Sequence, residues 1–264
     1  MAVPEARQFD DDLGDRAQRS ARLLDVAPQL GDAIEPDHLQ AARAALRVPV
    51  VDLPAGPWDR AGLLAVSGHA FGAVVLSGLV TRHLDIGGHP ALDLHGPGDL
   101  LGVQGLPAAL LHAGDAWAAT VPTRVGILDD RFLVAARRWP RLVTGLFEQL
   151  QEQRDRLLLQ LVIAEQPRVE DRVLALFWHL ADRFGRVTSD GIVLSLALTH
   201  EAVGRLIGAR RPTVTLAMRA LAERGSIVRR TDRSWLVCET PGDVVLSAAT
   251  LGRKAQPVPV APPD

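Results

Sequence analysis

The sequence predicts an α+β protein in which a β-rich domain, one long helix and a small helical domain follow one another. Residues 48–128 contain short apolar runs separated by glycine, proline and aspartate, which is typical of strands joined by turns. Residues 139–166 carry a helical pattern interrupted only by Pro140 and Gly145. Residues 198–221 combine a helix cap, a turn glycine and a second helix start.

Composition indicates a globular protein without a membrane segment. The chain has 264 residues, enough for two domains, and is 47% hydrophobic and 23% charged. Its longest apolar stretch, residues 63–80, is broken by glycine, serine and histidine. The N-terminus lacks the basic start and apolar run of an export signal. The single cysteine, Cys238, excludes an internal disulfide, an iron–sulfur cluster and a multi-cysteine zinc site, and fits a cytoplasmic protein.

The expected domain organisation has five parts. An N-terminal helical or loose segment (1–40) precedes a β domain (41–136), a long helix (137–166), a helical domain (167–240) and a mobile tail (241–264). The strands expected in the β domain are Val48–Leu53, Gly62–Val66, Gly72–Leu76, Val80–Ile86, Ala91–Leu94, Ala116–Val121 and Arg124–Leu128. Regular short strands with glycine-rich turns favour a compact roll or barrel.

The long helix has the seam of a helix that pairs with a second helix. The positions of this seam follow spacings of three and four, and all but one of them are apolar: Val143, Leu146, Leu150, Gln153, Leu157, Leu161 and Ala164. Charged side chains at 152, 154, 155 and 156 occupy much of the remaining surface. We therefore expect a homodimer through this helix; the alternative is one amphipathic helix packed on its own domain. A second amphipathic helix is expected over residues 169–184.

Residues 198–221 predict two short helices joined by a tight turn. Thr199 suits the N-cap of the first helix, which then begins at the next residue. Gly204 leaves room for the second helix to approach, and Gly208 can take the backbone angles of the turn. Pro212 suits the first position of the second helix. This arrangement is typical of a DNA-reading helix-turn-helix.

The second of these helices has two different faces on a helical wheel. The inner face, expected to anchor on the first helix, consists of Val214, Ala217, Met218 and Leu221. The outer face, expected to contact base edges in the major groove, consists of Pro212, Thr215, Leu216 and Arg219. The alternative is a helical hairpin with an ordinary solvated arginine face.

The same region is basic, as a DNA-binding module requires. Residues 195–237 hold eight arginines against three acidic residues, a net charge of +5, so the rest of the chain carries −7. Residues 226–237 are expected to form a strand, a turn and a strand that touch phosphate as a wing. Base reading is expected of Arg211, Thr215, Leu216 and Arg219, and positioning on the DNA backbone of Thr199, His200, Arg210, Arg230 and Arg233. Pro212 and Thr213 complete the predicted DNA contacts.

With these features the chain resembles the Crp/Fnr family of bacterial transcription regulators over about residues 40–238. The motif at 198–221 is the most specific, and residues 74–80 and 98–102 resemble strand and turn motifs of that family's β-roll. The resemblance implies an effector-sensing, cyclic-nucleotide-binding-like β-roll, a dimerisation helix and a C-terminal winged helix-turn-helix. It implies double-stranded DNA, a second copy of the chain, an unknown small-molecule effector and RNA polymerase as partners. No enzyme activity, cofactor or metal is expected.

The resemblance also implies an unusual operator. Arg211 falls where family members commonly place an arginine that reads guanine. Pro212 and Leu216 stand where the best-known members have a glutamate and a second arginine. A proline or leucine can contact a thymine methyl group, but it cannot accept from cytosine or fork onto guanine.

The expected effector site departs from that of the cyclic-nucleotide-binding members, which supply a Gly-Glu pair and later an Arg-Ser pair. Here Gly102 is followed by Val103 and Gln104, and the later pair falls near His112 and Ala113. Both charged side chains are missing, and phosphate recognition depends on charge-assisted hydrogen bonds. We therefore expect that the chain does not bind cyclic AMP in the usual way of the family.

Two other functions remain open from the sequence. The sensing domain holds five histidines, His69, His83, His89, His95 and His112, without a close metal-ligand spacing. Convergence of these histidines would favour a metal or haem site, or a cupin-like metal enzyme fused to a DNA-binding module. The third reading is a constitutive DNA binder whose β domain has lost its effector.

Overall fold

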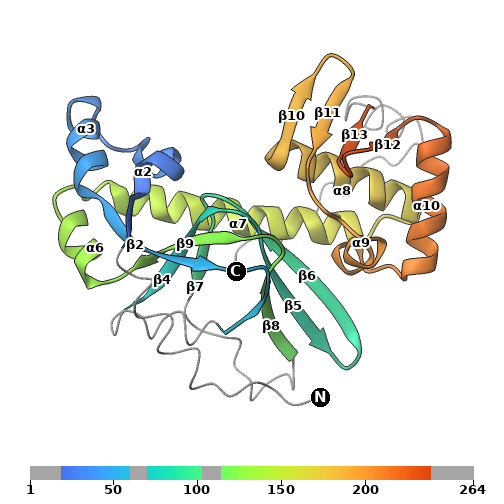
Figure 1. Ribbon diagram of the computed structural model, residues 1–264, viewed down its shortest axis with the longest axis horizontal. Helices are drawn as coiled ribbons and strands as arrows, with labels where there is room; N and C mark the ends of the chain where they lie inside the picture. The colour runs from blue at the N-terminus through green and yellow to red at the C-terminus, as the bar shows by residue number, and fades with distance from the viewer. Residues whose placement is uncertain (1–18, 60–69, 103–113, 239–264) are drawn as a thin grey trace, which may run out of the picture. The chain divides into compact units, whose positions relative to one another are not determined.

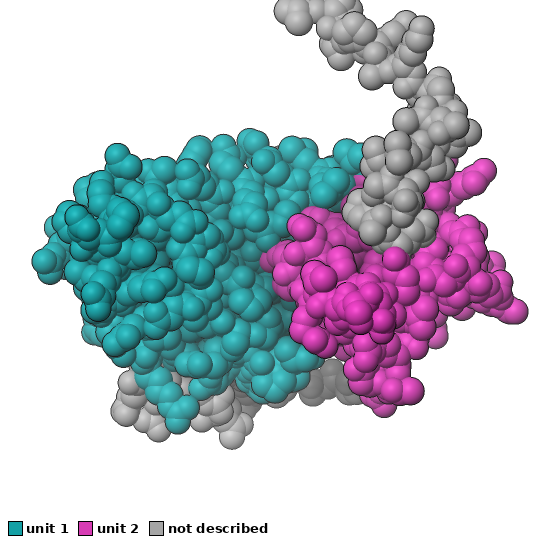
Figure 2. Space-filling model, turned by 90° about the horizontal axis from the view of Figure 1, so that it is seen from above, with its two compact units in different colours: residues 1–162 teal, residues 163–264 magenta. Residues whose placement is uncertain are grey.

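The computed structural model describes residues 19–59, 70–102 and 114–238 (Figure 1). The chain forms two compact units, residues 1–162 and 163–264, which Figure 2 distinguishes by colour. Within the described ranges, no helix is both long enough and apolar enough to span a membrane. Each unit is described by itself below.

The described residues of unit 1 form two antiparallel sheets, as a β-roll requires. The five-stranded sheet has the order β1-β2-β9-β4-β7 and the four-stranded sheet the order β3-β8-β5-β6. The strands of the first sheet are β1 (Ser20–Arg22), β2 (Arg47–Leu53), β4 (Gly72–Ser77), β7 (Leu100–Gly102) and β9 (Thr123–Leu128). Those of the second are β3 (Gly56–Trp58), β5 (Val80–Ile86), β6 (His89–His95) and β8 (Gly114–Ala119).

The side chains of each strand point alternately to the two faces of the sheet, and this divides the core of unit 1 into two layers. Val51 and Val75 lie in a cluster that includes Trp58 and Trp117 of the second sheet. Their neighbours Val50 and Val74 lie in a different cluster on the opposite face of the first sheet, because successive side chains of a strand point to opposite faces. Both faces of the five-stranded sheet are therefore covered.

Short helices form most of the second layer. They are α2 (Leu23–Val26), the 3₁₀ helix η1 (Pro28–Gly31), α3 (Pro36–Ala45) and α6 (Asp130–Ala136). Asp129 is the N-cap of helix α6, and its carboxylate accepts from the backbone amides of Arg131 and Phe132, both at 3.1 Å. Phe132 is 1% exposed and belongs to this layer.

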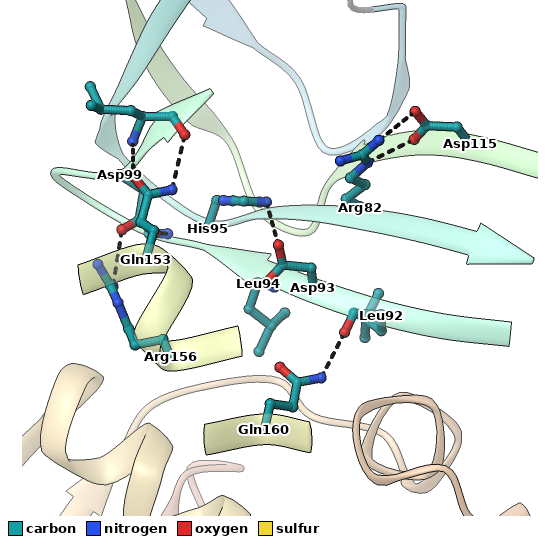
Figure 3. A network of polar contacts seen from close by, with 12 residues as sticks. Arg82, Leu92, Asp93, Leu94, His95, Asp99, Asp115, Gln153, Arg156 and Gln160 are labelled. Atoms are coloured by element: carbon teal, nitrogen blue, oxygen red, sulfur yellow. Dashed lines mark hydrogen bonds and ion pairs between the residues drawn. The ribbon is translucent and has the colours of Figure 1, made fainter. Parts of the chain in front are cut away.

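The long helix α7 (Leu142–Ala164) turns a polar side toward the β-roll (Figure 3). Gln153 donates to the carbonyl oxygen of Leu100 at 3.0 Å and accepts from the Leu100 amide at 2.9 Å. Arg156 donates to the carboxylate of Asp99 at 3.1 Å. Gln160 donates to the carbonyl oxygen of Leu92 at 3.0 Å. We call the side chains that make these contacts, with Gln149, the polar stripe; Gln149 accepts from Gln29 at 3.2 Å.

The polar stripe corrects two expectations for the long helix. Gln153 was expected in the apolar seam, yet it is hydrogen-bonded to the roll, and Leu146 packs against the core of unit 1. Arg156, expected to be a surface charge, has a side chain only 17% exposed. Burial lowers its pKa from the ordinary arginine value, while Glu152 and Asp93 act in the opposite direction.

A different side of α7 exposes a row of large apolar residues. We call Val143, Phe147, Leu150, Leu157 and Leu161 the apolar stripe; they are between 47% and 67% exposed. Their spacing of three, four and seven keeps them on one line of the helix. The helix thus packs on unit 1 through its polar stripe together with Leu142 and Leu146, and it leaves the apolar stripe exposed, which is unusual for a surface helix.

Residues 163–238, the described part of unit 2, hold three helices and a four-stranded sheet. They are α8 (Val169–Phe184), α9 (His200–Ile207) and α10 (Arg211–Glu223), with strands β10 (Gly185–Thr188), β11 (Gly191–Leu194), β12 (Ile227–Arg229) and β13 (Trp235–Val237). The sheet has the order β10-β11-β13-β12. Phe177 of α8 meets Trp235 edge to face, with ring centroids 5.3 Å apart.

The described residues contain five strands that the sequence did not predict, and one predicted strand is left untested. Four of the five are β1, β3 and the two strands of the β10–β11 hairpin; the fifth is β7, which lies in the 98–102 motif. The strand expected at residues 62–66 lies outside the described residues, as does the tail at 241–264. The hairpin had a recognisable signal, because the Asp190-Gly191 dipeptide, which is typical of hairpin turns, lies between the two strands.

Candidate nucleic-acid interface

Helix α9 begins where its cap predicts. The hydroxyl of Thr199 accepts from the amide of Ala202 at 3.1 Å, which satisfies one of the free donors at the helix start. Arg205 pairs with Glu201 at 2.6 Å, one turn apart on the exposed side. The other side of the helix is buried: Val203, Gly204, Leu206 and Ile207.

Two glycines allow α10 to follow α9 closely. Gly208 caps α9 in the left-handed conformation, with φ 65° and ψ 34°. A Cβ at Gly204 would collide with the carbonyl oxygen of Ala209, and the Gly204 carbonyl accepts from the Ala209 amide at 2.9 Å. The turn between the helices therefore depends on the small size of one glycine and the backbone freedom of the other.

Helix α10 has the two faces that its sequence predicts. Val214, Ala217, Met218 and Leu221 are buried. The residues predicted to contact DNA from this helix are all exposed: Arg211, Pro212, Thr213, Thr215, Leu216 and Arg219. Arg210 is the exposed N-cap, so that Arg211 is the first helical residue and Pro212 the second rather than the first. Proline is tolerated there because amides in the first turn have no partner within the helix.

His200 and Thr215 join the two helices at the outer surface. Nδ1 of His200 lies 2.9 Å from the hydroxyl of Thr215. That hydroxyl donates its hydrogen to the carbonyl oxygen of Arg211 at 3.0 Å. A hydroxyl has one hydrogen, so Nδ1 of His200 must be the donor in the first contact. His200, predicted to position the DNA backbone, thus also holds a side chain of the second helix.

The wing is a tight turn between β12 and β13. The amide of Arg233 donates to the carbonyl oxygen of Arg230 at 3.1 Å, and the amide of Arg230 donates to the carbonyl oxygen of Ser234 at 3.0 Å. Among the described residues, Arg233 is the only residue other than glycine with a positive φ, at 65°. Arg230 and Arg233 are both exposed, as a phosphate-contacting wing requires.

Asp232 stabilises this turn from its centre. Its carboxylate accepts from the hydroxyl of Ser234 at 2.6 Å and from the Ser234 amide at 2.9 Å. These two hydrogen bonds, assisted by the charge of Arg230, hold the pKa of the Asp232 carboxyl below its ordinary value. The turn therefore contains a carboxylate that remains ionised.

Two basic features of unit 2 were not predicted as DNA contacts. The guanidinium of Arg229 lies over the ring of Trp235, 4.2 Å from its centroid, which keeps an exposed charge beside the wing. Arg172 donates to the carbonyl oxygen of Gln166 at 2.6 Å and to that of Ile207 at 3.4 Å, so it connects the start of α8 with the end of α9. Its role is structural, and only the folded chain reveals it.

The expected effector site is mostly outside the described residues. Val103, Gln104, His112 and Ala113 lie there, as does His69. Gly102 ends β7 and is exposed. His83 contacts the hydroxyl of Thr81 at 3.0 Å, and His95 contacts Asp93 at 3.0 Å. In the described part of the chain, His, Cys, Asp and Glu side chains form no group of three suited to hold a metal ion.

Taken with its charge, this geometry defines a winged helix-turn-helix module that follows a β-roll in the sequence. A family model described as a Crp-like helix-turn-helix domain matches residues 171–241. This match and the fold confirm the predicted resemblance to Crp/Fnr regulators. No curated protein matches the sequence.

Solved structures with the same architecture are distant in sequence. A cyclic nucleotide-binding domain containing protein from Listeria monocytogenes EGD-e has a TM-score of 0.60 and 14% identity, over 81% of this chain and 97% of that one. A CooA mutant from Carboxydothermus hydrogenoformans has a TM-score of 0.58 and 17% identity, over 76% and 88%. CprK in complex with OCPA has a TM-score of 0.52 and 15% identity, over 75% and 89%. These likenesses establish the fold.

Proposed function

We propose that the protein is a cytoplasmic, dimeric transcription regulator that binds a near-palindromic operator. The observation that carries the proposal is the exposed outer face of α10, which presents the predicted base-reading residues beside a wing with two exposed arginines. In a helix-turn-helix dimer, two such helices enter successive major grooves about 34 Å apart. The net charge of +5 over residues 195–237 supports binding to phosphate.

The apolar stripe of α7 supports the dimer. Large apolar side chains in a continuous row are rarely left in water, and here the polar stripe already occupies the side of α7 that contacts the roll. A second copy of the helix offers a matching stripe, which gives the knobs-into-holes packing of a two-helix coil. Arg154 interrupts the row at one position, and its side chain is 63% exposed.

Control by a signal other than cyclic AMP follows from the missing Glu and Arg at residues 103 and 112. The signal would act on the roll and change the population of dimers competent to bind DNA. RNA polymerase is the further partner expected of such a regulator. A constitutive binder is the second candidate, since direct hydrogen bonds between the polar stripe and the roll connect the two.

Selection of bound duplexes from a random pool tests the proposed function. We expect a near-palindromic sequence with half-sites about one helical turn apart. In mobility shifts at fixed salt, Arg211→Ala should lose discrimination at one base pair of each half-site, whereas Arg233→Ala should weaken binding to all duplexes alike. Equal losses on all DNA for both variants would contradict the assignment, and so would a wild-type protein without preference among duplexes in low salt.

A comparison of affinity with and without effector separates the two candidates. Extract from cells changes the affinity of the purified dimer for its operator if the roll senses a small molecule. A constitutive binder has the same affinity with and without the extract.

A further inference from the structure

The outer face of α10 has an apolar centre. Pro212 and Leu216 lie one turn apart, and Thr215 lies beside them, so the three side chains are neighbours on the helix surface. We call these three residues the 212–216 patch. Leu216 is 69% exposed, and no described residue covers it in the folded chain. An apolar side chain at the centre of a DNA-reading face gains most from contact with an apolar group on the DNA.

Internal hydrogen bonds remove the donor that Thr215 would otherwise offer. Its only hydroxyl hydrogen goes to the carbonyl oxygen of Arg211 at 3.0 Å, and its oxygen accepts from Nδ1 of His200. Thr215 therefore cannot donate to guanine N7 or O6, adenine N7 or thymine O4. The methyl group of Thr215 takes no part in these hydrogen bonds and can contact a base. Pro212 and Leu216 offer only carbon to a base edge.

The charged residues beside the patch do not change this conclusion. Arg219 pairs with Glu223 at 2.8 Å, and both side chains are exposed, so the pair is weak and Arg219 remains available to DNA. Arg211 lies at the start of the helix, one turn before Thr215. Cationic contacts thus flank the patch, and Pro212 and Leu216 present only carbon to a base edge.

We infer that the 212–216 patch recognises the C5-methyl group of a pyrimidine in the major groove. This inference rests on the proposed function, because it requires α10 to enter the groove. The C5-methyl group is the only apolar feature of the base edges there. Thymine and 5-methylcytosine both carry it, so the same patch accepts either source.

The test begins with the selected operator and replaces each thymine of both half-sites by deoxyuridine, which removes the methyl group and keeps every hydrogen-bonding group. We expect about fourfold weaker binding at one or two positions of each half-site, from the burial of one methyl group. In Leu216→Ala the penalty at one of these positions should fall to less than twofold. Val187→Ala, at a residue 79% exposed on the β10–β11 hairpin, is the control and should keep the full penalty.

A second arm separates the two sources of the methyl group. The sensitive thymine is exchanged for cytosine and then for 5-methylcytosine, with guanine opposite each. Recovery of part of the lost affinity by 5-methylcytosine shows that the methyl group is read in either base. No recovery, together with a deoxyuridine penalty, shows that thymine alone is the source.

Two results would overturn the inference while leaving the proposed function intact. The first is an operator that binds specifically and loses no affinity with deoxyuridine at any position. The second is a deoxyuridine penalty that persists in both Leu216→Ala and Pro212→Ala, because the methyl group would then act through DNA shape. Failure of the proposed function gives a different result, since no operator would be selected.

Discussion

Arg156 of the long helix and Asp99 of the β-roll form an ion pair at 3.1 Å in which the aspartate is almost completely buried. The side chain of Asp99 is 2% exposed, and its second oxygen accepts from the amide of Gly96 at 2.7 Å. The pair joins a turn of the roll to the centre of α7 (Figure 3). Removal of the arginine leaves a buried carboxylate with one partner fewer.

Arg156→Met should therefore lower the free energy of unfolding by about 3–5 kcal/mol, the usual cost of an uncompensated buried charge. Urea denaturation measures the change. Arg154→Met is the matched control, since its side chain is 63% exposed and its pair with Asp155 is on the surface; it should change stability by less than about 1 kcal/mol. Equal losses in the two variants would show that Asp99 does not depend on Arg156.

A charge in the apolar stripe of α7 should separate the dimer. Leu157→Glu buries a carboxylate in the apolar interface of each copy, which should weaken association at least about a hundredfold. Sedimentation equilibrium should then report the mass of one chain, 28.4 kDa. Leu159→Glu is the control, because Leu159 is 46% exposed, close to the 47% of Leu157, yet lies about 160° around the helix from the stripe. A dimer that survives Leu157→Glu would refute this interface.

The turn of the helix-turn-helix should depend on the backbone conformation of Gly208 rather than on its size. No atom lies within 4 Å of a Cβ built at Gly208, but its φ is 65°. Gly208→Val should cost about 1–3 kcal/mol because a β-branched residue is strained in the left-handed region. Asparagine tolerates that region, so Gly208→Asn should cost less than about 1 kcal/mol. Thermal melting of the two variants measures the difference in stability. Equal losses of stability in both variants would show that packing, rather than backbone conformation, requires glycine here.

The wing should gain stability and lose affinity when Arg233 is replaced by glycine. Arg233 has a φ of 65°, which glycine adopts without strain, so Arg233→Gly should raise the free energy of unfolding by up to about 1 kcal/mol. Loss of a phosphate contact should lower the salt slope of DNA binding by about 1. Arg233→Ala removes the same charge and keeps the strain. It should therefore weaken binding without the gain in stability.

Asp232 should make the wing sensitive to acid. Because hydrogen bonds from Ser234 lower its pKa in the folded chain, its contribution to stability is complete above the ordinary aspartate value of 3.8. That contribution is lost as the pH falls through the lowered folded pKa. An NMR titration of the Asp232 carboxyl carbon measures this pKa. Ser234→Ala should return it toward the ordinary value, and an unchanged titration in this variant would show that Ser234 is not the cause.

The helix-turn-helix was predictable because its rules are local. Thr199 caps α9, Gly208 takes the left-handed turn and Val214 and Leu221 are buried, all as their spacing indicates. Each of these outcomes depends on residues within about one turn of helix. The start of α10 differs from the prediction by one residue, because Arg210 rather than Arg211 takes the extended N-cap conformation.

Short strands without an apolar pattern were less predictable. β3 contains Pro57, and β1 has only three residues, so neither shows a clear alternation. Both form because a long partner is available: β1 pairs with β2, and β3 pairs with β8. Pairing with a distant segment, rather than the sequence of the strand itself, decides such elements.

Helix α7 shows most clearly which features follow from the sequence and which depend on the tertiary structure. The periodicity of residues 143–161 was enough to establish a long helix with an apolar line along it, since helical geometry alone places residues three and four apart on one side. The side that faces the roll was decided by the folded chain. Gln153 and Arg156 meet Leu100 and Asp99, which are 53 and 57 positions away in the sequence, and buried polar groups must find their partners wherever the fold brings them.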